Sequence, residues 1–137
     1  MNKLIVDGSG ATFGRMASFV AKELLKGGSV DVLNSEKVLI SGDKNVFAKR
    51  VREKREMGSG GSLKGPKYIR QEDRLLKRMI RGMLPRDRAR GRDAFKRLKC
   101  HIGNGDFKED ELKNVKTFNH KKLMKSSTIK EIMELIK

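Results

Sequence analysis

The first 34 residues follow the order strand, helix, strand, and this order constrains the fold more than any other feature of the chain. KLIVD (3–7) is a short apolar run that leads into a glycine-rich stretch. Apolar residues then recur at the spacing of one helix face: Phe13, Met16, Ala17, Val20, Ala21 and Leu24. Gly27 and Gly28 end this helix, and VDVLN (30–34) is the second strand. Because a crossover of this kind places its two strands parallel in one sheet, the pattern predicts an α/β fold.

Shorter patterns predict the other elements of a single domain over residues 1–137. The remaining expected elements are strands at 37–41 and 99–102 and helices after Asp43, over about 72–83, within 86–99 and within 127–137. In the C-terminal helix, Thr128 and Glu131 form a capping box. The polar stretch 103–125 is expected to be irregular, with His120 at the surface.

Positive charge is concentrated in the middle of the chain. The sequence has 33 Lys and Arg against 17 Asp and Glu, and residues 44–99 hold 20 of the former and six of the latter, a net charge of +14. Solubility alone needs a net charge of about 2 to 8 on a small domain. The larger excess favours a polyanionic partner, because its countercharge would offset self-repulsion in the fold. A solvated surface that binds nothing is the alternative.

The composition of residues 44–99 favours folded RNA as this partner. Twelve of the 20 cations are arginine, whose planar guanidinium binds phosphate through two hydrogen bonds and stacks on bases. The chain has no Trp and one Tyr, which is too few rings for a platform that stacks single strands. Tyr68 is the one candidate for a stacking contact, and a position at the edge of the core is its alternative. We expect the glycine-rich loop 58–67 to be flexible until RNA binds.

The residues expected to contact RNA are mostly cations of this basic region. They are Arg15, Lys49, Arg50, Arg52, Arg55, Lys64, Lys67, Tyr68, Arg70, Arg74, Arg78, Arg81, Arg86, Arg88, Arg90, Arg92, Lys96, Arg97 and Lys99. Arg15 is the one member that lies outside the basic region. It follows the glycine-rich stretch directly and is the residue there that would meet an RNA phosphate.

The glycine-rich stretch itself, DGSGATFGR (7–15), is compared with the loops that bind nucleotide phosphates. Gly8 and Gly10 have the spacing of a dinucleotide fingerprint, but Gly14 comes one residue too late for its third glycine. No Walker pattern is present. A tight turn from strand to helix is therefore the favoured interpretation. A nucleotide-binding enzyme is the alternative.

Catalytic constellations are sparse. Asp7, Glu36 and Asp43 lie near expected strand ends and could bind Mg²⁺ in a nuclease, although Asp7 and Asp43 suit turn and cap positions equally well. Cys100 and His101 are adjacent, so in a strand they point to opposite faces and form no dyad. A single cysteine forms no intramolecular disulfide and fits a cytoplasmic setting. No catalytic residue, metal or cofactor is predicted, and no apolar run approaches the roughly 18 residues of a membrane span.

Four stretches together resemble the large-subunit ribosomal protein thirteen family in its archaeal and eukaryotic form. They are IVDGSGATFGRMAS (5–18), VLNSEKVLISG (32–42), GPKYIR (65–70) and RMIRGMLPRDRARGRDAFKRLK (78–99). The resemblance implies a three-layer α/β/α domain around a small parallel sheet of about four strands, with basic helical and loop insertions. It also implies a structural, non-enzymatic component of the large ribosomal subunit that binds rRNA beside neighbouring ribosomal proteins. No membrane or small-molecule substrate comes with it.

Overall fold

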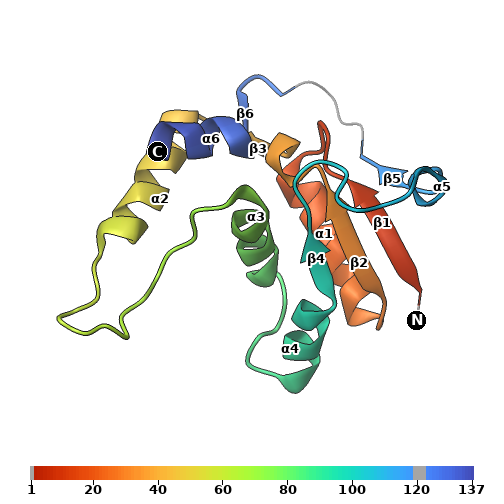
Figure 1. Ribbon diagram of the computed structural model, residues 1–137, viewed down its shortest axis with the longest axis horizontal. Coiled ribbons are helices and arrows are strands. Elements are labelled where there is room, and N and C mark those ends of the chain that lie inside the picture. The colour runs from red at the N-terminus through yellow and green to blue at the C-terminus, as the bar shows by residue number, and fades with distance from the viewer. Residues whose placement is uncertain (1, 119–122) are drawn as a thin grey trace.

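The computed structural model of the protein describes residues 2–118 and 123–137 and is built around a parallel sheet. Four strands lie in the order β4-β2-β1-β5, and every neighbouring pair is parallel (Figure 1). The strands are β1 (Lys3–Asp7), β2 (Ser29–Leu33), β4 (Leu98–Cys100) and β5 (Lys116–Thr117). Helices flank this sheet, which confirms the predicted α/β/α class with a small parallel sheet.

Helix α1 (Phe13–Leu25) connects β1 to β2, as the opening pattern predicts. The two strands pair with Leu4 opposite Val30 and Val6 opposite Val32. The predicted apolar stripe of the helix is buried at Met16, Ala17, Val20, Ala21 and Leu24. Removing these side chains from water is the main force that holds the helix on the sheet.

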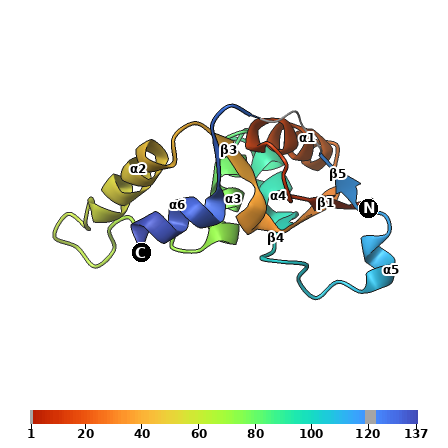
Figure 2. The same cartoon turned by 90° about the horizontal axis from the view of Figure 1, so that it is seen from above.

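Two helices of the basic segment pack beside α1. They are α3 (Glu72–Arg81), which buries Leu75, Leu76 and Ile80, and α4 (Ala89–Lys96), which buries Ala94. The short helix α5 (Glu109–Leu112) lies on the other side of the strands from α1 (Figure 2). Helix α3 is the helix expected over about 72–83, and it ends two residues earlier, at Arg81. Its polar face carries the cations.

A second, two-stranded sheet lies apart from the first. The strand expected at 37–41 forms as β3 (Leu39–Ser41), after a 3-10 helix η1 (Ser35–Lys37), and pairs antiparallel with β6 (Ser126–Thr128). The fourth strand of the parallel sheet is instead β5, in the stretch that was expected to be irregular. That stretch also contains α5, so the expectation of an irregular path is only partly right.

Helices α2 (Lys44–Glu56) and α6 (Ile129–Ile136) lie side by side at one end of the molecule (Figure 1). Each begins at a predicted cap: Asp43 accepts a hydrogen bond from the Asn45 amide at 2.8 Å, and Thr128 accepts one from the Glu131 amide at 3.2 Å. The helix expected within 127–137 thus begins at Ile129. His120 lies outside the described residues, and none of the helices described in 2–118 and 123–137 is long and apolar enough to cross a membrane.

Candidate nucleic-acid interface

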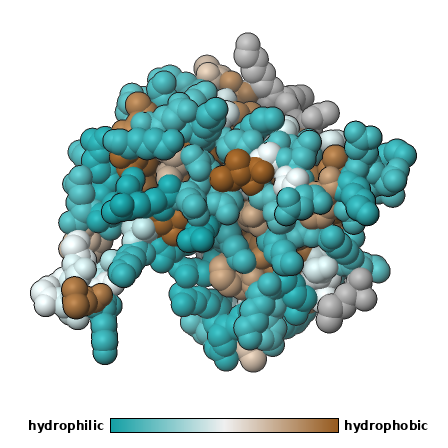
Figure 3. Space-filling model, in the orientation of Figure 1, coloured by the Kyte–Doolittle hydropathy of each residue, from teal (hydrophilic) through white to brown (hydrophobic). Residues whose placement is uncertain are grey.

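The basic region, residues 44–99, forms α2, the loop that connects it to α3, then α3, the turn at 82–88 and α4. These elements occupy one side of the molecule, and the loop after α2 extends away from the sheet (Figure 1). Hydrophilic side chains cover most of this face, while an apolar residue stands at the tip of the extended loop (Figure 3). Leu63 in that loop is 96% exposed.

The charges of the basic region have almost no acidic partners within the protein. All of its 56 residues are described, and within them a single ion pair forms, Lys96 with Asp93, at 3.8 Å. The exposed cations are Lys44, Lys49, Arg50, Arg52, Lys54, Lys64, Lys67, Arg70, Arg74, Arg86, Arg88, Arg90, Arg92, Lys96 and Lys99. Salt bridges within the fold therefore leave the net charge of +14 uncompensated at the surface.

Three arginines influence one another at the end of α3. Partial burial and the neighbouring guanidinium groups of Arg86 and Arg78 lower the pKa of Arg81 from its ordinary value. A site of this kind favours an anion, because negative charge would relieve both the repulsion and the loss of hydration. The structure thus brings three predicted contacts from α3 and the following turn into one cluster.

A close backbone approach fixes the turn that carries Arg86. Gly91 in α4 is buried, and a Cβ atom there would overlap the Pro85 carbonyl and lie 3.1 Å from the Arg86 nitrogen. Leu84 is also buried beside this turn and anchors it to the core. The glycine therefore lets α4 pack closely against the turn, and this contact fixes the direction of the arginines in the turn.

Some predicted RNA contacts already serve the fold. Arg97 donates hydrogen bonds to the carbonyl oxygens of Gly28 at 3.1 Å and Leu24 at 2.8 Å, and Arg90 donates to Leu25 O at 2.9 Å. The carbonyls at the end of a helix lack partners within it and carry partial negative charge, so the bonds to Leu24 and Leu25 stabilise the C-terminus of α1. The bond to Gly28 holds the segment that leads into β2. Any role of theirs in RNA binding stays a prediction.

Two further arginines bind backbone oxygens but remain exposed. Arg92 donates to Asp87 O at 2.9 Å, and Arg52 of α2 donates to Leu135 O near the end of α6 at 2.8 Å. A guanidinium has five N–H donors, so one hydrogen bond within the protein leaves donors for phosphate.

Tyr68 lies at the edge of the core, and its stacking on an RNA base stays a prediction. It is half-buried and packs against the core, yet the Arg78 guanidinium carbon lies 4.9 Å and the Lys54 Nζ 5.8 Å from its ring centroid. Lys54 is absent from the predicted contacts, although helical periodicity places it one turn after Arg50. That spacing was the signal that could have identified it.

The three carboxylates of the nuclease hypothesis each accept hydrogen bonds that hold the fold. Asp7 accepts hydrogen bonds from the Ser9 amide and the Asn34 side chain, both at 2.9 Å. Glu36 accepts one from the Gly103 amide at 3.1 Å, and Asp43 caps α2. Within residues 2–118 and 123–137, no three side chains of the types that bind metal come together. The structure thus gives these carboxylates local roles.

The glycine-rich turn uses its amides within the protein. The Gly8 amide donates to Leu33 O at 2.9 Å and the Ala11 amide to Gly8 O at 3.1 Å. A Cβ atom on Gly8 would lie 2.7 Å from Val38 Cγ2 and 2.8 Å from Leu33 O, so a larger residue does not fit there. A phosphate cradle needs amides that point into open space, and these amides hold the turn against β2 instead.

Cys100 is unsuited to nucleophilic chemistry. Burial raises the pKa of its thiol to about 12, so the reactive thiolate is scarce near neutral pH. His101 is oriented by Asp31, with 3.4 Å between His101 Nε2 and Asp31 Oδ1, and its ring packs edge-on against Phe107. The pair therefore belongs to the packing around β4.

The chain is similar to a known family over most of its length. The family model described as Ribosomal protein L13 matches residues 1–107. The curated large ribosomal subunit protein uL13 of Methanosarcina barkeri is 49% identical over 100 residues, which cover 72% of this chain and 70% of that protein. The protein of that name from Archaeoglobus fulgidus is 44% identical over 99 residues, 72% of this chain and 62% of its own length. The one from Methanosphaera stadtmanae is 34% identical over 135 residues, 96% of this chain and 95% of that protein.

Proposed function

The chain belongs to the ribosomal protein L13 family, and from this premise we propose that it is a structural component of the large ribosomal subunit that binds large-subunit rRNA through residues 44–99. The family consists of ribosomal proteins rather than enzymes. The alignments to the Methanosarcina and Archaeoglobus relatives span 70% and 62% of those proteins, so contacts with neighbouring ribosomal proteins are part of the same proposal.

One observation supports RNA binding above all others. The basic region carries a net charge of +14, and within its fully described length only Lys96 and Asp93 form an ion pair. Charges at this density repel one another, which destabilises the free protein. RNA phosphates supply the countercharge, and the counterions they release on binding add a large favourable entropy.

The arrangement of the cations favours recognition of RNA shape and backbone over base sequence. The exposed cations come from α2, the loop after it, α3, the turn at 82–88, α4 and β4, so they can reach phosphates of several RNA segments at once. Arginine predominates among them, and its fork binds phosphate through two hydrogen bonds. Bringing RNA segments together in this way would support assembly of the subunit.

Salt dependence tests the electrostatic account. We expect the affinity of the protein for a large-subunit rRNA fragment, measured by filter binding, to fall at least about 10³-fold between roughly 50 and 200 mM salt if several phosphates are contacted. An affinity that hardly changes over this range would refute it.

Sedimentation tests the ribosomal role separately. In a cell extract, the native protein should sediment with large ribosomal subunits through a sucrose gradient and leave them only at high salt. Recovery of the protein at the top of the gradient at low salt would contradict a structural role in the subunit.

A further inference from the structure

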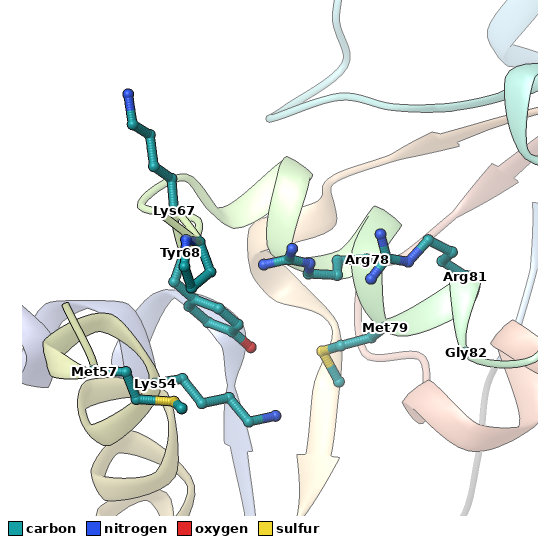
Figure 4. A pocket seen from close by; sticks show the side chains of 9 residues that line it. Lys54, Met57, Lys67, Tyr68, Arg78, Met79, Arg81 and Gly82 are labelled. Atoms are coloured by element: carbon teal, nitrogen blue, oxygen red, sulfur yellow. The ribbon is translucent and has the colours of Figure 1, made fainter. Parts of the chain in front are cut away.

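A cavity of about 530 Å³ opens between the end of α2, the segment before α3 and the end of α3. The side chains around it are shown in Figure 4, where Tyr68 projects from the loop segment toward the space between α2 and α3. The lining residues are Lys54, Met57, Pro66, Lys67, Tyr68, Arg78, Met79, Arg81 and Gly82. Its volume lies within the roughly 300–1,000 Å³ that is typical of sites for small molecules.

The lining combines flat or flexible apolar groups with positive charge and contains no acid. Met57, Tyr68 and Met79 supply a ring and two thioethers, and methionine adapts readily to the faces of aromatic ligands. Lysine and arginine side chains stand around these groups (Figure 4). A ligand that matches both parts has a flat, apolar face and an anionic group a few ångströms from it.

Tyr68 is a prepared stacking surface. It packs partly against the core, which limits its motion, and its ring lies beneath Arg78 at 4.9 Å and Lys54 at 5.8 Å. A π face that attracts cations also stacks well on a nucleobase. A base that displaces the more distant Lys54 could take its place on the ring.

From this geometry we propose that the cavity binds one unpaired nucleotide of the RNA, with its base stacked on Tyr68 against Met79 and its phosphate between Arg78 and Arg81. The inference rests on the proposed function, because it identifies the part of the RNA that this site receives. The mutual repulsion of Arg78, Arg81 and Arg86 supports the anion position. Phosphate contacts elsewhere in the basic region would then position the RNA, and this cavity would select an unpaired base.

The chain provides its own reporter for this site. Tyr68 is the only tyrosine of the sequence, so incorporation of 3-fluorotyrosine gives a single ¹⁹F resonance, from the cavity. The probes are an RNA hairpin with one bulged adenosine, the same hairpin without the bulge, AMP and tripolyphosphate. We expect the bulged hairpin to shift the resonance at a concentration at which the paired hairpin, although bound, leaves it in place. AMP should shift it more weakly, and tripolyphosphate hardly at all.

Each other outcome overturns the proposal in a recognisable way. Equal shifts with both hairpins would mean that the ring reports general binding. A shift of the resonance with AMP but not with bulged RNA would indicate a site for free nucleotides. A shift with tripolyphosphate as large as that with bulged RNA would indicate a site for anions alone. Binding of both hairpins in a filter assay without any shift would refute the nucleotide site and leave the proposed function intact. Failure of both hairpins to bind would refute the proposed function as well.

Substitutions at Tyr68 separate stacking from packing. Tyr68→Phe should bind the bulged hairpin like the wild type, whereas Tyr68→Leu should lose about fivefold to hundredfold in affinity, the contribution of one stacked base. The matched control is Phe107→Leu, since the Phe107 ring also lies under a lysine, with Lys3 Nζ 4.7 Å from its centroid, but outside the basic region. The loss must be absent for the paired hairpin. An equal loss for both hairpins, or none for either, would refute a stacking role, and thermal unfolding checks that each variant is folded.

Discussion

Substitution of Gly91 by alanine should destabilise the protein and disturb its RNA-binding surface at the same time. The added Cβ would overlap the Pro85 carbonyl, and both groups belong to backbone that cannot rotate away. The turn at 82–88 would have to move by about 1 Å or more to restore an ordinary contact. Forcing atoms into a packed site costs about 1–3 kcal/mol, while alanine in a helix gains up to about 1 kcal/mol over glycine. We therefore expect a net loss of about 1–2 kcal/mol.

Gly14→Ala is the matched control, because it introduces the same methyl group into another helix. Apart from the adjacent residues and the backbone of α1 itself, no atom lies within 4 Å of the position that a Cβ would take at Gly14. The substitution should therefore leave the stability unchanged or raise it by up to about 1 kcal/mol. Gly91→Ala should lower the melting temperature by about 3–5 °C for each kcal/mol lost in a chain of this size, whereas Gly14→Ala should leave it unchanged or raise it.

Calorimetry and RNA binding together test the reasoning. Gly91→Ala should melt several degrees below the wild type. At a temperature at which it is still folded it should bind rRNA more weakly, because Arg86 and Arg88 lie in the displaced turn and move with it. Gly14→Ala should bind as the wild type does. A Gly91→Ala protein that melts with or above the wild type would refute the close approach as the reason for a glycine at this position.

Four further predictions have defined outcomes. The Cys100 thiol has a pKa of about 12 in the folded protein against an ordinary value of 9.0, so it keeps its proton at a pH at which the unfolded thiol loses it. The free energy of unfolding should therefore fall as the pH rises above about 9, and it should fall less in Cys100→Ala. The native protein should also resist alkylation of this thiol at pH 8. Arg97→Ala should cost about 1.5–3 kcal/mol in urea unfolding, because two charged hydrogen bonds are lost, one to the end of α1 and one to Gly28 beyond it. Arg88→Ala, at an exposed site, should stay within about 0.5 kcal/mol of wild type yet weaken RNA binding; equal stabilities for the two variants would contradict the assignment. Loop 58–67 should be cleaved by trypsin in the free protein and protected by rRNA, and unchanged cleavage would count against ordering on RNA.

The sequence predicts the elements whose burial repeats regularly and misses those that depend on distant partners. The stripe of α1 is visible because every third or fourth side chain meets the sheet. β5 is invisible because it consists of Lys116 and Thr117, both exposed, and forms only where β1 provides an edge. The partner of β3 is β6, almost 90 residues away, and no local pattern specifies this pairing.

The same division applies to the candidate site. Charge density identifies the basic region, because the net charge of a segment follows from its residue types and does not depend on the fold. Which arginines are used by the fold is a different matter: Arg90 and Arg97 resemble Arg86 and Arg88 in the sequence. They differ only because α4 lies against the C-terminus of α1, which offers them carbonyl oxygens. The cavity at Tyr68 likewise needs α2 and α3 to meet across a loop.

Salt should act in opposite directions on the free protein and on its complex with RNA. The unpaired cations of residues 44–99 repel one another in the free fold, so screening by salt should relieve this repulsion and stabilise the protein. The same salt weakens RNA binding, because releasing counterions into a more concentrated salt solution gains less entropy. A fold stabilised by its own ion pairs would instead lose stability as salt rises. The free protein is therefore under electrostatic strain that RNA removes, and bound RNA raises its stability in proportion to the logarithm of the RNA concentration above Kd.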